Sequence, residues 1–160
     1  AGNFRVEEAG ENVEKYLIIT SSFDDKDRLV KVKERYQKHP NLKGNILDYI
    51  NPLERVIITN YEYDLVDANL VQTGLDILGV YNYEKIKSIR VKETRKNYSG
   101  LKKVLGKANK VFHYDYLFID LVDLGDSNTR SFPEQRHEVF EIKENKLKQY
   151  KEDPIHVYSI

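Results

Sequence analysis

The chain lacks several residue types that small proteins use for reactive or structural sites. Its 160 residues include no cysteine, no methionine and no tryptophan. Without cysteine the protein has no disulfide, no cysteine-ligated zinc and no thiol nucleophile. Its apolar runs, such as residues 16–19 and 56–58, are far shorter than the roughly 20 residues that a membrane-spanning helix needs. The sequence therefore excludes thiol chemistry and predicts no transmembrane segment in this chain.

The first residues are Ala1-Gly2-Asn3, with no initiator methionine before them. We expect that a leading segment has been lost, either by trimming or by removal of a signal or an anchor. Removal of a signal predicts an extracellular or cell-surface protein, and a cytoplasmic location is the alternative. The absence of cysteine is compatible with both locations.

The residues that are present describe a globular protein with a polar surface. The chain is 40% hydrophobic and 32% charged, and twelve tyrosines and six phenylalanines supply aromatic core material. Its length fits one domain, or two very small ones. Residues 1–11 are polar and predict a flexible lead-in, so a single domain is expected over residues 12–160.

Helices are expected mainly in the first half of the chain. Leu29, Val32 and Tyr36 have helical spacing, which predicts a helix over 24–38 that begins at a capping sequence around Ser21 and Ser22. A second helix is expected over 42–50. A third is expected over 68–78, with an Asp cap before it and Gly79 after it.

Strands are expected mainly in the second half. They are predicted at 16–20, 54–64, 88–93 and 111–124, followed by a hairpin of 137–142 and 147–151 and a last strand over 155–160. Alternation along 111–124 predicts that one sheet face buries Phe112, Tyr116, Phe118 and Val122. Helices in the first half followed by an antiparallel meander in the second half give an α+β fold.

Two short segments end in the same Leu-Gly pair. Residues 74–79 read Gly-Leu-Asp-Ile-Leu-Gly, and residues 100–106 read Gly-Leu-Lys-Lys-Val-Leu-Gly. A strand, a loop and a second strand follow the later copy. This order, over about residues 98–150, resembles the helix–Leu-Gly–strand–strand repeat of small extracytoplasmic proteins related to β-lactamase inhibitor protein. The family usually has proline soon after the glycine, where this chain has Lys107-Ala108. The resemblance implies an extracytoplasmic protein.

Charge is strongly segregated along a chain whose net charge is zero. Residues 85–110 hold ten bases and a single acid, Glu93, so the net charge of this basic block is +9. Residues 1–84 hold ten bases and fifteen acids, and residues 111–160 hold six bases and ten acids. A local excess of this size creates a field that attracts anionic partners.

The basic block supplies the candidate binding residues, with a tyrosine among them: Lys85, Lys87, Arg90, Lys92, Arg95, Lys96, Tyr98, Lys102, Lys103 and Lys107. We expect Lys92, Lys96, Lys103 and Lys107 to be exposed on one side, because unpaired charges are not buried. The expected partner is a protein or an anionic polymer. Nucleic acid is disfavoured, because the total charge is zero and no nucleic-acid motif is present. The other interpretation is a solvated face paired with acids of the same chain.

No catalytic motif accompanies the basic block. The one candidate metal or acid–base cluster is formed by His113, Asp115, His137 and Glu141, and no motif spacing supports it. The acids Asp120, Asp123 and Asp126 lack the spacing of a calcium loop. We therefore expect no cofactor and no enzyme, but an extracytoplasmic binding domain. A cytosolic immunity- or inhibitor-type protein is the alternative, and a metal-dependent hydrolase is the third hypothesis.

Overall fold

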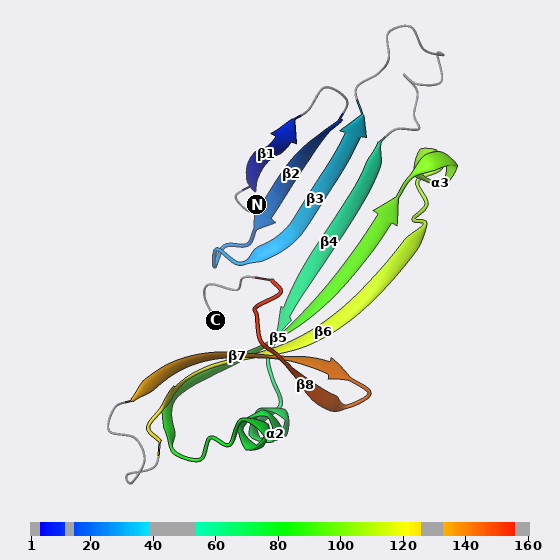
Figure 1. The fold of residues 1–160 in the computed structure, drawn as a ribbon. Helices are drawn as coiled ribbons and strands as arrows, with labels where there is room; N and C mark the ends of the chain where they lie inside the picture. Colours follow the sequence, from blue (N-terminus) through cyan, green and yellow to red (C-terminus); the bar gives the residue numbers. More distant parts are fainter. Residues whose placement is uncertain (1–3, 12–14, 39–53, 126–132, 156–160) are drawn as a thin grey trace, which may run out of the picture. The chain divides into compact units, whose positions relative to one another are not determined.

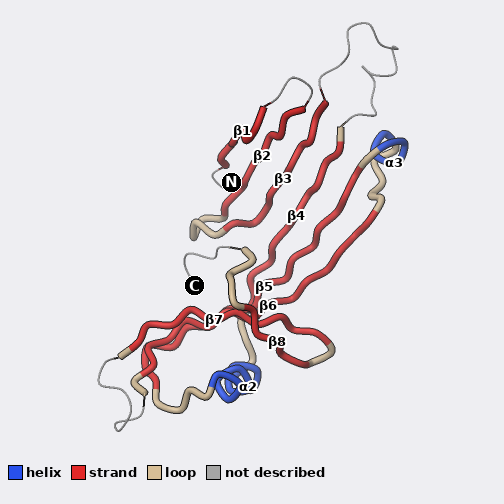
Figure 2. Tube along the Cα trace, in the orientation of Figure 1, coloured by secondary structure: helices blue, strands red, loops and turns tan. Residues whose placement is uncertain are grey.

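The computed structural model describes residues 4–11, 15–38, 54–125 and 133–155 (Figure 1). They form an eight-stranded sheet in which the strand order equals the chain order. The strands are β1 (Phe4–Glu11), β2 (Lys15–Phe23), β3 (Leu29–Lys38), β4 (Arg55–Asp64), β5 (Tyr83–Tyr98), β6 (Lys110–Asp123), β7 (Glu134–Lys143) and β8 (Lys146–Tyr150). Helix α2 (Ala68–Leu78) connects β4 to β5, and the short helix α3 (Gly100–Val104) connects β5 to β6 (Figure 2).

The expected order of helices first and sheet second is wrong. The structure is mostly antiparallel sheet, with 61% strand and 14% helix, and the meander already begins at β1. The expected lead-in 1–11 contains β1, which pairs with β2. The expected helix 42–50 and most of the expected last strand 155–160 lie outside the described residues.

The expected helix over 24–38 is a hairpin turn followed by β3. Asp24 Oδ1 accepts hydrogen bonds from the backbone N–H groups of Lys26 and Arg28, both at 2.9 Å. Asp27 has φ +60°, as a tight turn requires. Asp24 therefore closes the turn between β2 and β3, where a helix start was expected. Leu29 and Val32 have helical spacing, but pairing with β2 and β4 makes this segment strand β3.

Other expected elements are present. The predicted strand 54–64 is β4, the predicted helix 68–78 is α2, and the predicted strand 111–124 is β6. The predicted hairpin is β7–β8, whose turn has positive φ at Glu144 and Asn145. Strand β5 is much longer than the predicted 88–93.

The chain divides into two compact units, each of which contains part of β4, β5 and β6. Unit 1 comprises Ala1–Tyr61 and Glu93–His113, and unit 2 comprises Glu62–Lys92 and Tyr114–Ile160. The expected single domain over 12–160 stays a prediction.

Unit 2 has a two-sided core. Helix α2 packs Leu75 against Leu117, Ile119 and Phe140 of β6 and β7. Gly74 permits this close approach, because a Cβ atom there would lie 3.0 Å from Ile119 Cδ1. All four consecutive residues 116–119 are buried, so both faces of β6 are covered there.

The prediction for the aromatic strand is confirmed only in part. Tyr116 and Phe118 are buried, but Val122 is half-buried and Phe112 is exposed. Unit 1 has far less core than unit 2. In its described part the buried residues are Val56, Thr59 and Glu93.

Candidate functional site

The candidate binding residues are divided between the two units. Unit 2 holds Lys85, Lys87, Arg90 and Lys92, and unit 1 holds Arg95, Lys96, Tyr98, Lys102, Lys103 and Lys107. Residues 85–98 all lie on β5, which extends beyond both ends of the predicted strand 88–93.

In unit 2 two of the cations are paired with acids. Arg90 makes a two-point contact with Asp115, with Nε at 2.9 Å from Oδ1 and the second nitrogen at 2.6 Å from Oδ2. Lys92 Nζ lies 3.6 Å from Asp64 Oδ2. Lys85 and Lys87 are exposed. The interpretation of basic residues paired with acids of the same chain therefore holds for part of this group.

In unit 1 the cations of β5 do not share one face. Arg95 and Lys96 are consecutive in the strand and so point to opposite sides of the sheet. Arg95 lies 3.3 Å from Glu93 Oε2, and Glu93 is only 2% exposed. Burial raises the pKa of the Glu93 carboxyl, and the nearby Arg95 opposes that rise. Lys96 and Tyr98 are half-buried, so the expected exposure of Lys96 is wrong.

Lys103 belongs to an ion-pair cluster around Glu54. The Glu54 carboxylate accepts hydrogen bonds from Lys103 Nζ at 2.9 Å, Arg35 Nε at 2.6 Å and Gln37 at 3.2 Å. Burial alone would raise the pKa of Glu54, but these hydrogen bonds outweigh it and lower the pKa to about 2. Lys103 is therefore half-buried and neutralised, contrary to the expected exposure, and it anchors α3 to the residues around β3.

Residues 99–112 form a well-ordered turn at the end of the β5–β6 hairpin, here called the α3 tip (Figure 1). Asn109 closes its neck, because its N–H donates to Asn97 O at 2.7 Å and its Oδ1 accepts from Ser99 N at 2.7 Å. Helix α3 ends in a Schellman motif, in which Lys107 N donates to Lys102 O at 2.8 Å and Gly106 has φ +72°.

The α3 tip presents aliphatic side chains to solvent. Leu101, Val104 and Leu105 are 73%, 56% and 62% exposed. Their i, i+3 and i+4 spacing places them on one face of the turn. Exposed lysines flank them at positions 102, 107 and 110. Sequence reasoning found the lysines but missed the aliphatic residues, whose helical spacing inside a basic segment was the available signal.

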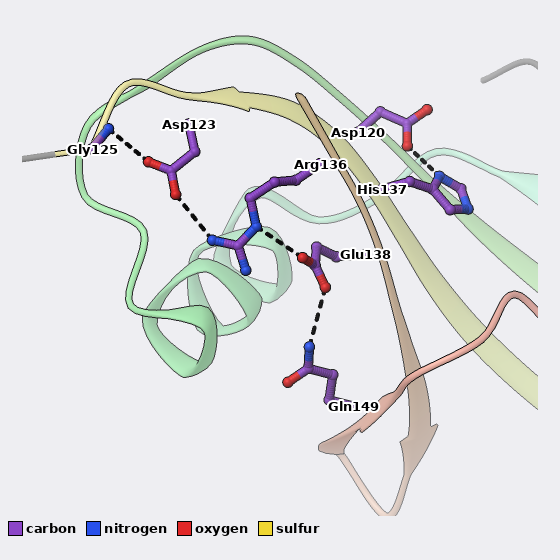
Figure 3. Close-up of polar contacts among 7 residues, drawn as sticks. All are labelled: Asp120, Asp123, Gly125, Arg136, His137, Glu138 and Gln149. Carbon is purple, nitrogen blue, oxygen red and sulfur yellow. Dashed lines mark hydrogen bonds and ion pairs between the residues drawn. The ribbon is translucent and has the colours of Figure 1, made fainter. Parts of the chain in front are cut away.

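The candidate metal residues have other partners. His137 on β7 lies between two carboxylates. Its Nδ1 contacts Asp120, its partner across the ladder (Figure 3). Its Nε2 lies 3.0 Å from Asp153 Oδ2. Asp115 pairs with Arg90, and Glu141 accepts a hydrogen bond from the Tyr150 hydroxyl. Among the described residues no group of three or more His, Asp or Glu has the geometry of a metal site.

A series of side-chain hydrogen bonds in unit 2 links strands β6, β7 and β8. Arg136 donates to Asp123 at 3.0 Å and to Glu138 at 2.9 Å, and Gln149 donates to Glu138 at 3.1 Å (Figure 3). Asp123 also accepts from the Gly125 N–H. With its oxygens engaged by an arginine and a backbone N–H, Asp123 ties β6 to β7. Asp126, the third acid of the calcium hypothesis, lies outside the described residues.

No protein-family model, no curated protein and no solved structure matches this chain. The resemblance of residues 98–150 to the repeat of β-lactamase inhibitor protein relatives stays a prediction. Across the described ranges, neither helix is long and apolar enough to cross a membrane.

Proposed function

We propose that the protein is a non-enzymatic binding domain that contacts an anionic macromolecular partner through the α3 tip. The main evidence is the exposed aliphatic face of Leu101, Val104 and Leu105. This face lies on a hydrogen-bonded turn that lysines flank. Contiguous exposed apolar side chains with a polar rim are typical of interaction sites. The extracellular or cell-surface location expected from the sequence is part of this proposal and stays a prediction.

The charge around the tip supports an anionic partner. Residues 94–114 contain six bases and no acid. The carboxylate of Glu54 approaches this segment but is shared between Lys103 and Arg35. Lys102, Lys107 and Lys110 are exposed and thus accessible to a partner. The proposed site is therefore smaller than the basic block 85–110. It excludes Arg90 and Lys92, which pair with Asp115 and Asp64.

Salt elution from a column that carries an immobilised polyanion tests this function. The tip variant Lys102→Gln, Lys107→Gln, Lys110→Gln should elute at clearly lower salt than the wild type, because exposed charge contacts are screened by ions. The matched control removes three exposed lysines of the β7–β8 hairpin: Lys143→Gln, Lys146→Gln and Lys148→Gln. Equal shifts for the two variants would show that only total charge matters and would overturn the proposed site.

A further inference from the structure

The α3 tip combines two kinds of side chain on one short turn. Its aliphatic face consists of Leu101, Val104 and Leu105, and exposed lysines adjoin this face. The turn lies at the end of the β5–β6 hairpin (Figure 1).

The composition of the tip separates two classes of partner. Energetically dominant residues at protein–protein interfaces are enriched in Trp, Tyr and Arg, whereas Lys is depleted there and Leu and Val are under-represented. The aliphatic face of the α3 tip has the disfavoured composition, with two leucines and a valine beside lysines, while Val111 and Phe112 at the base of the tip are also exposed, at 47% and 37%. Segments that lie at a membrane surface combine leucine on one side with lysine on the other. The tip resembles the second class.

The backbone of the tip is also suited to a membrane interface. The carbonyl groups of Ser99, Leu101, Lys102 and Lys103 all accept hydrogen bonds from within the turn. Polar backbone groups that approach hydrocarbon need internal partners, because lipid tails offer none. Since Asn109 and the Schellman motif already order the turn, binding does not have to order it.

We infer that the anionic partner is a lipid bilayer surface. In this arrangement the side chains of Leu101, Val104 and Leu105 enter the boundary between headgroups and acyl chains. Lys102, Lys107 and Lys110 contact anionic headgroups. This inference rests on the proposed function, since it names the class of partner for the same tip.

Flotation with vesicles tests the inference on the full chain. One set of vesicles is phosphatidylcholine alone, and the other contains about 30% phosphatidylglycerol, a fraction that gives the surface the negative potential that attracts basic segments. The wild type should float with the anionic vesicles and not with the zwitterionic ones. The tip lysine variant should bind roughly 100-fold more weakly, at about fivefold for each lysine removed. The β7–β8 lysine variant should bind like the wild type.

A second variant tests the aliphatic residues without changing charge. Leu101→Asn, Val104→Thr and Leu105→Asn together should weaken vesicle binding by about tenfold or more. The same variant should elute from the polyanion column like the wild type, because its lysines are intact. Its melting temperature should match that of the wild type, since these side chains contribute no core.

The outcomes separate the two proposals. If the wild type ignores both vesicle types while its polyanion binding depends on the tip lysines, the bilayer inference is overturned and the proposed function stands. A soluble anionic macromolecule, either an acidic protein or a polymer, is then the partner class. Vesicle binding that is unchanged in the aliphatic variant also overturns the inference. If the β7–β8 lysine variant weakens both polyanion and vesicle binding as much as the tip lysine variant does, both proposals are overturned.

Discussion

Helices α2 and α3 end in the same backbone motif but place it in opposite environments. In α2, Val80 N donates to Leu75 O at 3.0 Å, and Gly79 adopts φ +69°. In α3, Lys107 N donates to Lys102 O at 2.8 Å, and Gly106 occupies the left-handed position. The two residues joined by the outer hydrogen bond commonly make a hydrophobic contact. They are fully buried in α2, whereas in α3 both are exposed lysines.

The comparison shows that the same turn chemistry serves two purposes. Helix α2 attaches to its sheet by apolar packing, with Leu75 in the core and Gly74 against Ile119. Helix α3 attaches by charge, through Lys103 and Glu54, and its apolar face remains exposed. The backbone motif ends the helix, and the side chains around it determine whether the helix packs or presents a surface.

The largest expected effect comes from the leucine that follows the glycine in each helix. Leu75→Ala should lower the free energy of unfolding by about 2–5 kcal/mol, because it leaves a cavity in the core of unit 2. Leu101→Ala should change it by no more than about 0.5 kcal/mol, as is usual for exposed positions. Urea denaturation of both variants measures the difference. A loss above about 2 kcal/mol for Leu101→Ala would show that α3 packs like α2.

Much of the local structure was predictable from the sequence. Asp67, which caps α2 through Asn69 N at 2.8 Å, and Gly79 gave the right bounds for this helix. The predicted strand 88–93 lies within β5, where Ile89 and Val91, two residues apart, are buried on one face. In each of these cases the signal comes from neighbours within a few residues, which the sequence displays directly.

The failures involve partners that are distant in the chain. Residues 24–38 fit helical spacing and strand alternation equally well, and pairing with β2 and β4 decides for the strand. The basic block looked like one surface because the sequence does not show that Arg90 meets Asp115 or that Lys103 meets Glu54. Such ion pairs depend on the strand register, which local patterns leave open.

The second expected effect tests the attachment of α3 by charge. A carboxyl whose folded pKa is lowered, here from 4.5 to about 2, stabilises the folded state above pH 4.5 and loses that contribution as the pH falls through about 2. Glu54→Gln should therefore cost roughly 1–3 kcal/mol at neutral pH, and the cost should vanish at strongly acidic pH.

Urea denaturation at several pH values measures this cost, with the exposed Glu84→Gln as the matched control. If Glu54→Gln loses no more stability at neutral pH than Glu84→Gln, the ion pairs do not hold α3. The attachment of the tip would then have to be attributed to packing, as in α2.

The smallest expected effect concerns His137, which belongs to unit 2 and makes polar contacts with both carboxylates beside it. Burial lowers the pKa of His137, but hydrogen bonds to Asp120 and Asp153 outweigh it, and the net pKa lies above 6.5. The charged imidazolium therefore stabilises the fold fully below pH 6.5, and this contribution is lost as the pH rises through the raised value. The ring of Phe118, whose centroid lies 5.9 Å from that of His137, is uncharged and so contributes no ion pair to the imidazolium.

Melting temperatures at about pH 5.5 and about pH 8.5 should show this loss in the wild type and not in His137→Asn. His113→Asn is the matched control, because His113 is exposed, lies in unit 1 and has its Nδ1 3.5 Å from the Thr94 hydroxyl. The control should keep the wild-type dependence on pH. If His137→Asn keeps it as well, the two carboxylates do not hold a charged imidazole. Asp153 then needs another reason to lie beside β7, and the buried Ile155, whose N–H donates to Asp153 at 2.8 Å, becomes the residue that fixes the C-terminal segment by packing.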